Sequence, residues 1–158
     1  MSKPTVYLDT NIFSILHYRG GDAGVLRRQR ATHEWWEQER HFFSLLASKA
    51  VEGELANGDY PGKERALAEV RRLPYLDAVA AVQDVAAKLL AAQVVPETVP
   101  GDAIQLAFAT VYRVDYLLSW NRVIWWARRH KRNWRGSERH LGCARRLSYR
   151  RRAFRRLR

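Results

Sequence analysis

Carboxylates recur where the apolar segments of this sequence begin or end. Asp9 ends a run of buried-strand type, Glu54 lies in a helical turn after the second apolar run, and Asp102 opens a helix. Asn121 ends the last strand pattern of the chain. Open α/β sheets place their ligands at the carboxyl ends of the strands, so these four side chains are expected to converge.

An acidic pocket of this kind suits a hard divalent cation. Mg²⁺ and Mn²⁺ take oxygen ligands, usually a few carboxylates plus water. Such an ion activates water and stabilises the charge on a phosphodiester during in-line displacement. The pattern therefore indicates metal-assisted hydrolysis by Asp9, Glu54 and Asp102, with Asn121 completing the pocket.

Each of these residues also has an ordinary structural interpretation. Asp9 can cap the helix that follows it, and Asp102 can be a favourable partner of a helix dipole. Glu54 can be a solvated helix residue, and Glu52 is an equally plausible ligand by composition. Asp115 stands at a strand start, where a turn or capping role away from the pocket is expected.

Strand and helix patterns alternate along the first 121 residues. Strands are predicted at residues 6–8, 42–47 and 114–119. Helices are predicted at residues 12–18, after Thr32 as an N-cap, at 64–73 and 78–93, and from residue 101. A helical turn that carries Val51, Glu54 and Leu55 is predicted after Ser48. This alternation predicts an α/β fold, with a parallel sheet flanked by helices.

The positive charge of the chain is concentrated at its end. The 158 residues carry a formal net charge of +12, yet residues 122–158 hold 15 Lys and Arg against one acid, and residues 1–121 hold 13 against 15. We therefore divide the chain into a globular domain, residues 1–121, and an Arg-rich C-terminal tail, residues 122–158.

Three interpretations of this tail remain open. It can be a basic helix whose aromatic side chains pack on the body of the protein. It can be an RNA-binding segment, with cations for phosphates and tryptophans for stacking on bases. It can also be the product of a GC-rich gene read in a shifted frame, since arginine rises and acids vanish abruptly after Asn121.

The remaining composition predicts a cytoplasmic protein without membrane contact. The single cysteine, Cys143, excludes an intrachain disulfide framework and fits a reducing compartment. Asp9 and Asn11 interrupt the first apolar run, so no signal-peptide pattern is present, and no run approaches the roughly 18 apolar residues of a membrane span. No Gly-rich phosphate loop follows the first strand, which argues against a nucleotide-binding fold.

Four segments resemble, in order and spacing, the motifs of PIN-domain ribonucleases, especially VapC-type toxins of toxin–antitoxin pairs. They are VYLDTNIF at residues 6–13, SKAVEGEL at 48–55, DAIQLA at 102–107 and DYLLSWN at 115–121. The second motif ordinarily has a Ser, a Val three residues later, an acid three after that and then a Leu, a register that selects Glu54 over Glu52. Gln105 departs from the family, where many members have His, and the tail does not resemble the family's closing helix and strand.

This resemblance implies a PIN-like three-layer sandwich that cleaves RNA with Mg²⁺ or Mn²⁺. It implies that Asp9, Glu54 and Asp102 hold the metal and that Asn121 supports it directly or through water. The residues it implies for ordering the pocket are Thr10, Asn11 and Ser119.

The same resemblance implies two protein partners, a second copy of the chain in a homodimer and a cognate antitoxin. The leading hypothesis is therefore a metal-dependent endoribonuclease toxin. The alternatives are a non-catalytic RNA-binding protein and an inactive remnant whose altered C-terminus abolished function.

Overall fold

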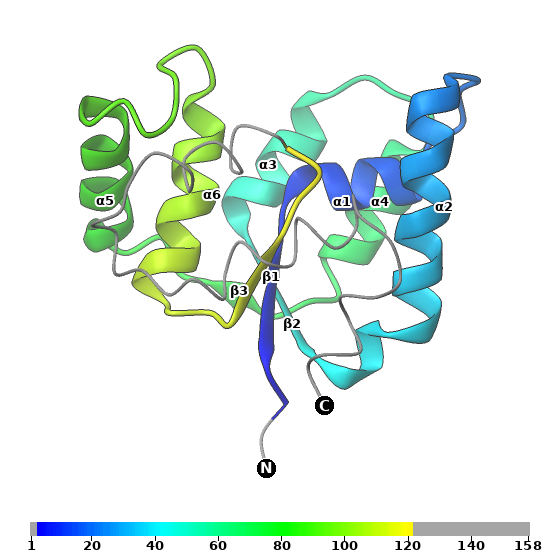
Figure 1. The fold of residues 1–158 in the computed structure, drawn as a ribbon, viewed down its shortest axis with the longest axis horizontal. Helices are drawn as coiled ribbons and strands as arrows, with labels where there is room; N and C mark the ends of the chain where they lie inside the picture. The colour runs from blue at the N-terminus through cyan, green and yellow to red at the C-terminus, as the bar shows by residue number, and fades with distance from the viewer. Residues whose placement is uncertain (1–2, 122–158) are drawn as a thin grey trace.

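Four parallel strands form the centre of the structure, a computed structural model that describes residues 3–121 (Figure 1). The Arg-rich tail, residues 122–158, and the interpretations given to it lie outside the described residues. The strands are β1 (Thr5–Leu8), β2 (Ser44–Ser48), β3 (Tyr75–Leu76) and β4 (Tyr116–Leu118), and they lie side by side in the order β3-β2-β1-β4.

Helices cover both faces of this sheet. In Figure 1, α5 and α6 lie together on one side of the strands, and α1, α2 and α4 lie on the other. The helical elements of the described residues are α1 (Thr10–Leu16), α2 (Ala23–Gln38), the 3-10 turn η1 (Arg40–Phe42), α3 (Lys49–Asn57), α4 (Lys63–Val70), α5 (Ala80–Ala91) and α6 (Pro100–Val111). The predicted α/β sandwich with a central parallel sheet flanked by helices is confirmed.

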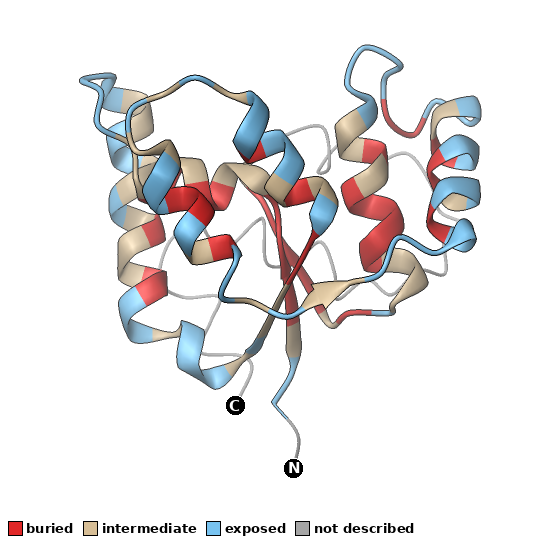
Figure 2. Cartoon of the chain, turned by 180° about the vertical axis from the view of Figure 1, so that it is seen from behind, coloured by how far each residue is buried: buried red, intermediate tan, exposed pale blue. Residues whose placement is uncertain are grey.

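Strands β1 and β4 are the most deeply buried of the sheet, whereas only the last two residues of β2 are buried (Figure 2). Val6, Tyr7 and Leu8 of β1 are all fully buried, and β4 is almost as completely enclosed. A strand covered by helices on both faces needs apolar side chains at every position, which explains why these segments show continuous apolar runs instead of alternation. None of the helices within residues 3–121 is long and apolar enough to cross a membrane.

The predicted helix start at Thr32 is wrong. Thr32 lies inside α2, which begins nine residues earlier, at Ala23. The Asp22 side chain caps the helix there by accepting a hydrogen bond from the backbone N–H of Val25 (2.7 Å). The buried Thr32 hydroxyl donates to the carbonyl of Arg28 (2.8 Å) and accepts from the indole N–H of Trp120 (2.9 Å). Threonine often caps helices, but Thr32 lies within one and uses its hydroxyl to join α2 to Trp120.

The sequence patterns also missed β3. This strand has only two residues, directly after Pro74, and pairs with the end of β2. Two residues carry no periodicity that could distinguish a strand from a loop.

Asp115 joins the amino ends of β1 and β4, the opposite end of the sheet from Asp9. Its carboxylate accepts hydrogen bonds from the backbone N–H (2.8 Å) and the hydroxyl (2.9 Å) of Thr5, and its own N–H donates to that hydroxyl (2.9 Å). The predicted position away from the pocket is confirmed, and in place of the predicted turn or capping role the Asp115 side chain joins two strand ends.

Asp115→Ala should lower the free energy of unfolding by about 1–3 kcal/mol, because two donors on Thr5 lose a charged acceptor. Urea denaturation measures the change. Asp115→Asn keeps one acceptor oxygen and should lose less. Equal stability of Asp115→Ala and the wild type would show that this contact contributes nothing to holding the strand ends.

Candidate functional site

Asp9 links the sheet to the first helix. Its backbone N–H donates to the carbonyl of Leu118 (3.0 Å), which continues the pairing of β1 with β4. Its side chain caps α1, accepting from the N–H of Thr10 (2.7 Å). The side chain is only 3% exposed, so a carboxylate is buried at the carboxyl end of the central strand. The capping role and the site role predicted for Asp9 are therefore compatible.

Asn11 and Ser119 hold the second oxygen of the Asp9 carboxylate. The Asn11 amide (2.7 Å) and the Ser119 hydroxyl both donate to it. The Asn11 carbonyl oxygen accepts from the N–H of Trp120 (2.8 Å), and the Ser119 hydroxyl accepts from the N–H of Asn121 (2.9 Å). These bonds tie the segment after β4 to the start of α1.

Glu54 reaches the same region from α3. One carboxylate oxygen accepts from the Thr10 hydroxyl, and the other accepts from the Gln105 amide of α6 (3.1 Å). The first turn of α6 passes so close that a Cβ on Gly101 would lie 2.8 Å from a Glu54 oxygen. The structure thus brings Glu54 between the starts of α1 and α6.

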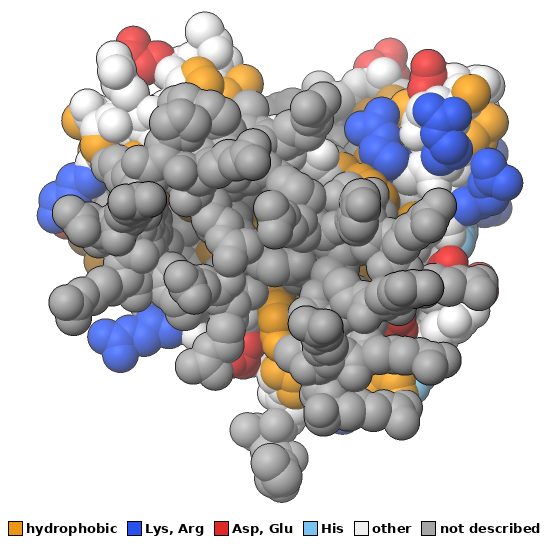
Figure 3. Space-filling model, in the orientation of Figure 1, with side chains coloured by type: hydrophobic (Ala, Val, Ile, Leu, Met, Phe, Trp, Pro, Cys, Tyr) orange, Lys and Arg blue, Asp and Glu red, His pale blue; other side chains and the backbone are white. Residues whose placement is uncertain are grey.

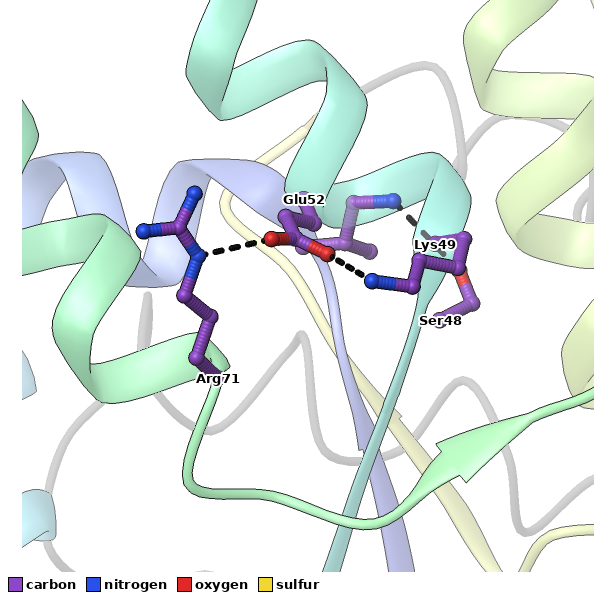
Figure 4. A network of polar contacts seen from close by, with 5 residues as sticks. Ser48, Lys49, Glu52 and Arg71 are labelled. Atoms are coloured by element: carbon purple, nitrogen blue, oxygen red, sulfur yellow. Dashed lines mark hydrogen bonds and ion pairs between the residues drawn. The ribbon is translucent and has the colours of Figure 1, made fainter.

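Glu52 has a different environment, shown in Figure 4. Its carboxylate forms ion pairs with Lys49 of the same helix (2.6 Å) and with Arg71 at the end of α4 (2.7 Å). Hydrogen bonds from Lys49 and then from Arg71 lower the pKa of Glu52 to about 2. Glu52 connects α3 to α4, so of the two glutamates it is Glu54 that lies with Thr10 and Gln105.

Asp102 stands in the first turn of α6 and is paired with Asn121. One Asp102 oxygen accepts from the Asn121 amide (2.7 Å). The other oxygen is buried and has no hydrogen-bond partner among the described residues. A buried acceptor left unpaired costs on the order of 1–3 kcal/mol, and a ligand that donates a hydrogen bond or carries positive charge would satisfy it.

The three carboxylates influence one another electrostatically. Burial raises the pKa of Asp9 to about 7; the hydrogen bond from Ser119 opposes this rise, and the charges of Glu54 and Asp102 add to it. Burial also raises the pKa of Asp102, against the hydrogen bond from Asn121 and together with the charge of Glu54. A cation among these groups would relieve both the desolvation and the repulsion.

The carboxylates are not arranged as a closed metal cage. Within residues 3–121, no group of three or more His, Cys, Asp and Glu side chains could hold a metal ion as placed. The Asp9 and Glu54 oxygens accept hydrogen bonds from neighbouring side chains instead. Mg²⁺, however, keeps several waters and needs only one or two carboxylates, so an all-oxygen site with one free Asp102 oxygen suits it. Direct ligation by Asp9, Glu54 and Asp102 together stays a prediction.

The sequence patterns missed the polar contacts beneath Glu54. Tyr7 and Ser48, both fully buried, bond to each other (2.7 Å), and the Tyr7 hydroxyl donates to Gln105 (2.6 Å). A tyrosine within an otherwise aliphatic strand was the available signal, because a buried phenol needs a partner for its hydroxyl.

Comparison of the chain with protein-family models, with curated proteins and with solved structures gave no match. What this protein does is therefore inferred from the geometry of its own residues.

Asp9→Asn should stabilise the protein increasingly as pH rises, measured without divalent ions. Because burial raises the pKa of Asp9 from 3.8 to about 7, Asp9 of the unfolded chain ionises between these values while Asp9 of the folded protein stays protonated. The wild type therefore loses stability over this range, by up to about 4 kcal/mol. The variant has no such loss. Between pH 4 and pH 8, the difference in unfolding temperature between the variant and the wild type should grow in favour of the variant until about pH 7. A difference that stays constant with pH would contradict the raised pKa.

Proposed function

We propose that this protein is a metal-dependent endoribonuclease of the PIN-domain, VapC-toxin type. The observation that supports the proposal is a set of shared contacts at the carboxyl end of the parallel sheet: Thr10 donates to both Asp9 and Glu54, and Asn121 donates to both Asp102 and Ser119. The charges of Glu54 and Asp102 both raise the pKa of Asp9. That end of an open α/β sheet is where ligands bind. The four motifs that resemble the family supply these same residues.

Some of the described residues would bind the ion directly, and others would orient the residues that bind it. Asp102, through its free oxygen, and Asp9 are the candidate ligands, and Glu54 lies beside them. Asn121 orients Asp102, while Thr10 orients Glu54. A bound Mg²⁺ or Mn²⁺ would supply activation of water and stabilisation of charge on the phosphodiester.

The partners belong to the proposal as well. The substrate is RNA, and the resemblance brings with it a cognate antitoxin, a homodimer and a cytoplasmic location. A cognate antitoxin would have to neutralise or cover the carboxylates, because the proposed cleavage requires that RNA and the metal ion reach them.

A non-catalytic RNA-binding protein is the second candidate. It is favoured by the lack of a three-ligand group within residues 3–121 and by exposed cations on the body of the protein. Arg27 and Arg30 are exposed on α2, and Figure 3 shows Lys and Arg side chains gathered over that part of the molecule. Such a protein would bind RNA phosphates through its Lys and Arg side chains and would not need its carboxylates to hold a metal ion.

If the first candidate is right, the full chain should cleave single-stranded RNA with Mg²⁺ or Mn²⁺ and stop when EDTA is added. Asp9→Asn should lower the rate at least about 100-fold, because a neutral amide is a poor ligand for a hard cation. Gel analysis of a labelled RNA measures the rate.

Glu52→Gln is the matched control for Glu54→Gln, since the two residues lie on the same helix. Glu54→Gln should reduce cleavage strongly, whereas Glu52→Gln removes only the ion pairs with Lys49 and Arg71 and should leave cleavage near the wild-type rate. The reverse order would show that Glu54 is not part of the site.

If the second candidate is right, the full chain should bind RNA without cutting it. Its affinity should fall steeply with salt, with a slope of about −0.7 per phosphate contact for a single strand, and Asp9→Asn should leave the affinity unchanged. Filter binding between 50 and 300 mM salt, roughly the range in which such slopes are read, measures it. Metal-dependent cleavage would eliminate this candidate.

A further inference from the structure

A line of four hydrogen-bonded side chains runs from the sheet to Glu54. Ser48 bonds to Tyr7 (2.7 Å), Tyr7 to Gln105 (2.6 Å) and Gln105 to Glu54 (3.1 Å). They come from the end of β2, from β1, from α6 and from α3. The first three are almost completely buried, whereas Glu54 is exposed.

Chemistry fixes the direction of every bond in this line. The carboxylate of Glu54 only accepts, so the amino group of the Gln105 amide must face it. The amide oxygen then faces Tyr7, whose single hydroxyl proton is therefore donated to Gln105. That leaves Ser48 as the donor to Tyr7. The amide cannot be turned over without placing two acceptors against each other at Glu54.

Tyr7 is well suited to hold the Gln105 amide in place. The Tyr7 hydroxyl is fully buried and donates to the Gln105 amide oxygen over 2.6 Å. Its ring stacks on Phe108 of α6, with ring centroids 5.7 Å apart, which fixes the position of the hydroxyl relative to the helix that carries Gln105.

We propose that Gln105 is a positioning residue, whose amide, oriented by Tyr7, keeps the Glu54 carboxylate beside Asp9 and Asp102. This inference rests on the proposed metal-dependent function. An exposed glutamate samples several rotamers, and holding it in one costs conformational entropy. Gln105 and Thr10 each occupy one Glu54 oxygen, so together they offset that cost before any ion arrives.

The test is Mn²⁺ affinity of the full chain, measured by titration calorimetry on the wild type, Gln105→Met, Tyr7→Phe and the double variant. Methionine matches glutamine in length without the amide, and phenylalanine keeps the ring that stacks on Phe108. Gln105→Met should weaken Mn²⁺ binding about 10- to 100-fold, as losses of such supporting contacts typically do. Tyr7→Phe should weaken it less.

The double variant separates positioning from simple packing. If Tyr7 acts through Gln105, Tyr7→Phe should have no further effect on Mn²⁺ affinity once Gln105 is methionine. Effects that multiply in the double variant would overturn the orienting role of Tyr7.

Thr110→Val is the matched control, because it removes a hydroxyl from the other end of the same helix, where it donates to the carbonyl of Leu106 (2.7 Å). It should leave Mn²⁺ affinity unchanged, and thermal unfolding should show that all variants are folded. If Gln105→Met does not fold, Tyr7→Phe decides alone, and wild-type affinity in that variant overturns the proposal.

Two further outcomes distinguish this inference from the proposed function. Wild-type Mn²⁺ affinity in Gln105→Met would overturn the role of Gln105 and leave the metal-dependent function standing. Absence of Mn²⁺ binding by the wild type would overturn both.

Discussion

The structure depends on one buried carboxylate, that of Asp9. Its backbone N–H continues the sheet to Leu118, and its side chain caps α1. A charge at that depth is tolerated only with donors around it, and here they are the N–H of Thr10, the amide of Asn11 and the hydroxyl of Ser119. The segment after β4 and the start of α1 therefore have to meet at this point.

The other two carboxylates make this point electrostatically unfavourable. Glu54 and Asp102 both raise the pKa of Asp9, and one buried oxygen of Asp102 has no donor among residues 3–121. The charges of Glu54 and Asp102 disfavour the ionised form of Asp9, so the stability of the fold alone does not explain this grouping. Repulsion of this kind is typical of sites whose ligand is positively charged.

The sheet and most helices could be predicted because continuous apolar runs and helical periodicity are local signals. The wrong start at Thr32 arose because cap preference is also local, whereas Asp22 and the bond from Trp120 decide the outcome. Asp9 and Asp102 could be placed at element ends from sequence. Which donors their oxygens accept from could not, since those donors lie far away in the chain and depend on how the helices pack.

Tyr7 shows why the core and the site cannot be treated separately. Its ring stacks on Phe108, and its hydroxyl donates to Gln105, so one residue of β1 fixes both the distance and the rotation of α6. Asp102 and Gln105 are three residues apart and share a face of that helix. Because α6 is rigid, the packing that seats Phe108 in the core also sets the position of Asp102. The position of Asp102 thus depends on the packing of Tyr7 against Phe108, two residues that are not themselves acidic.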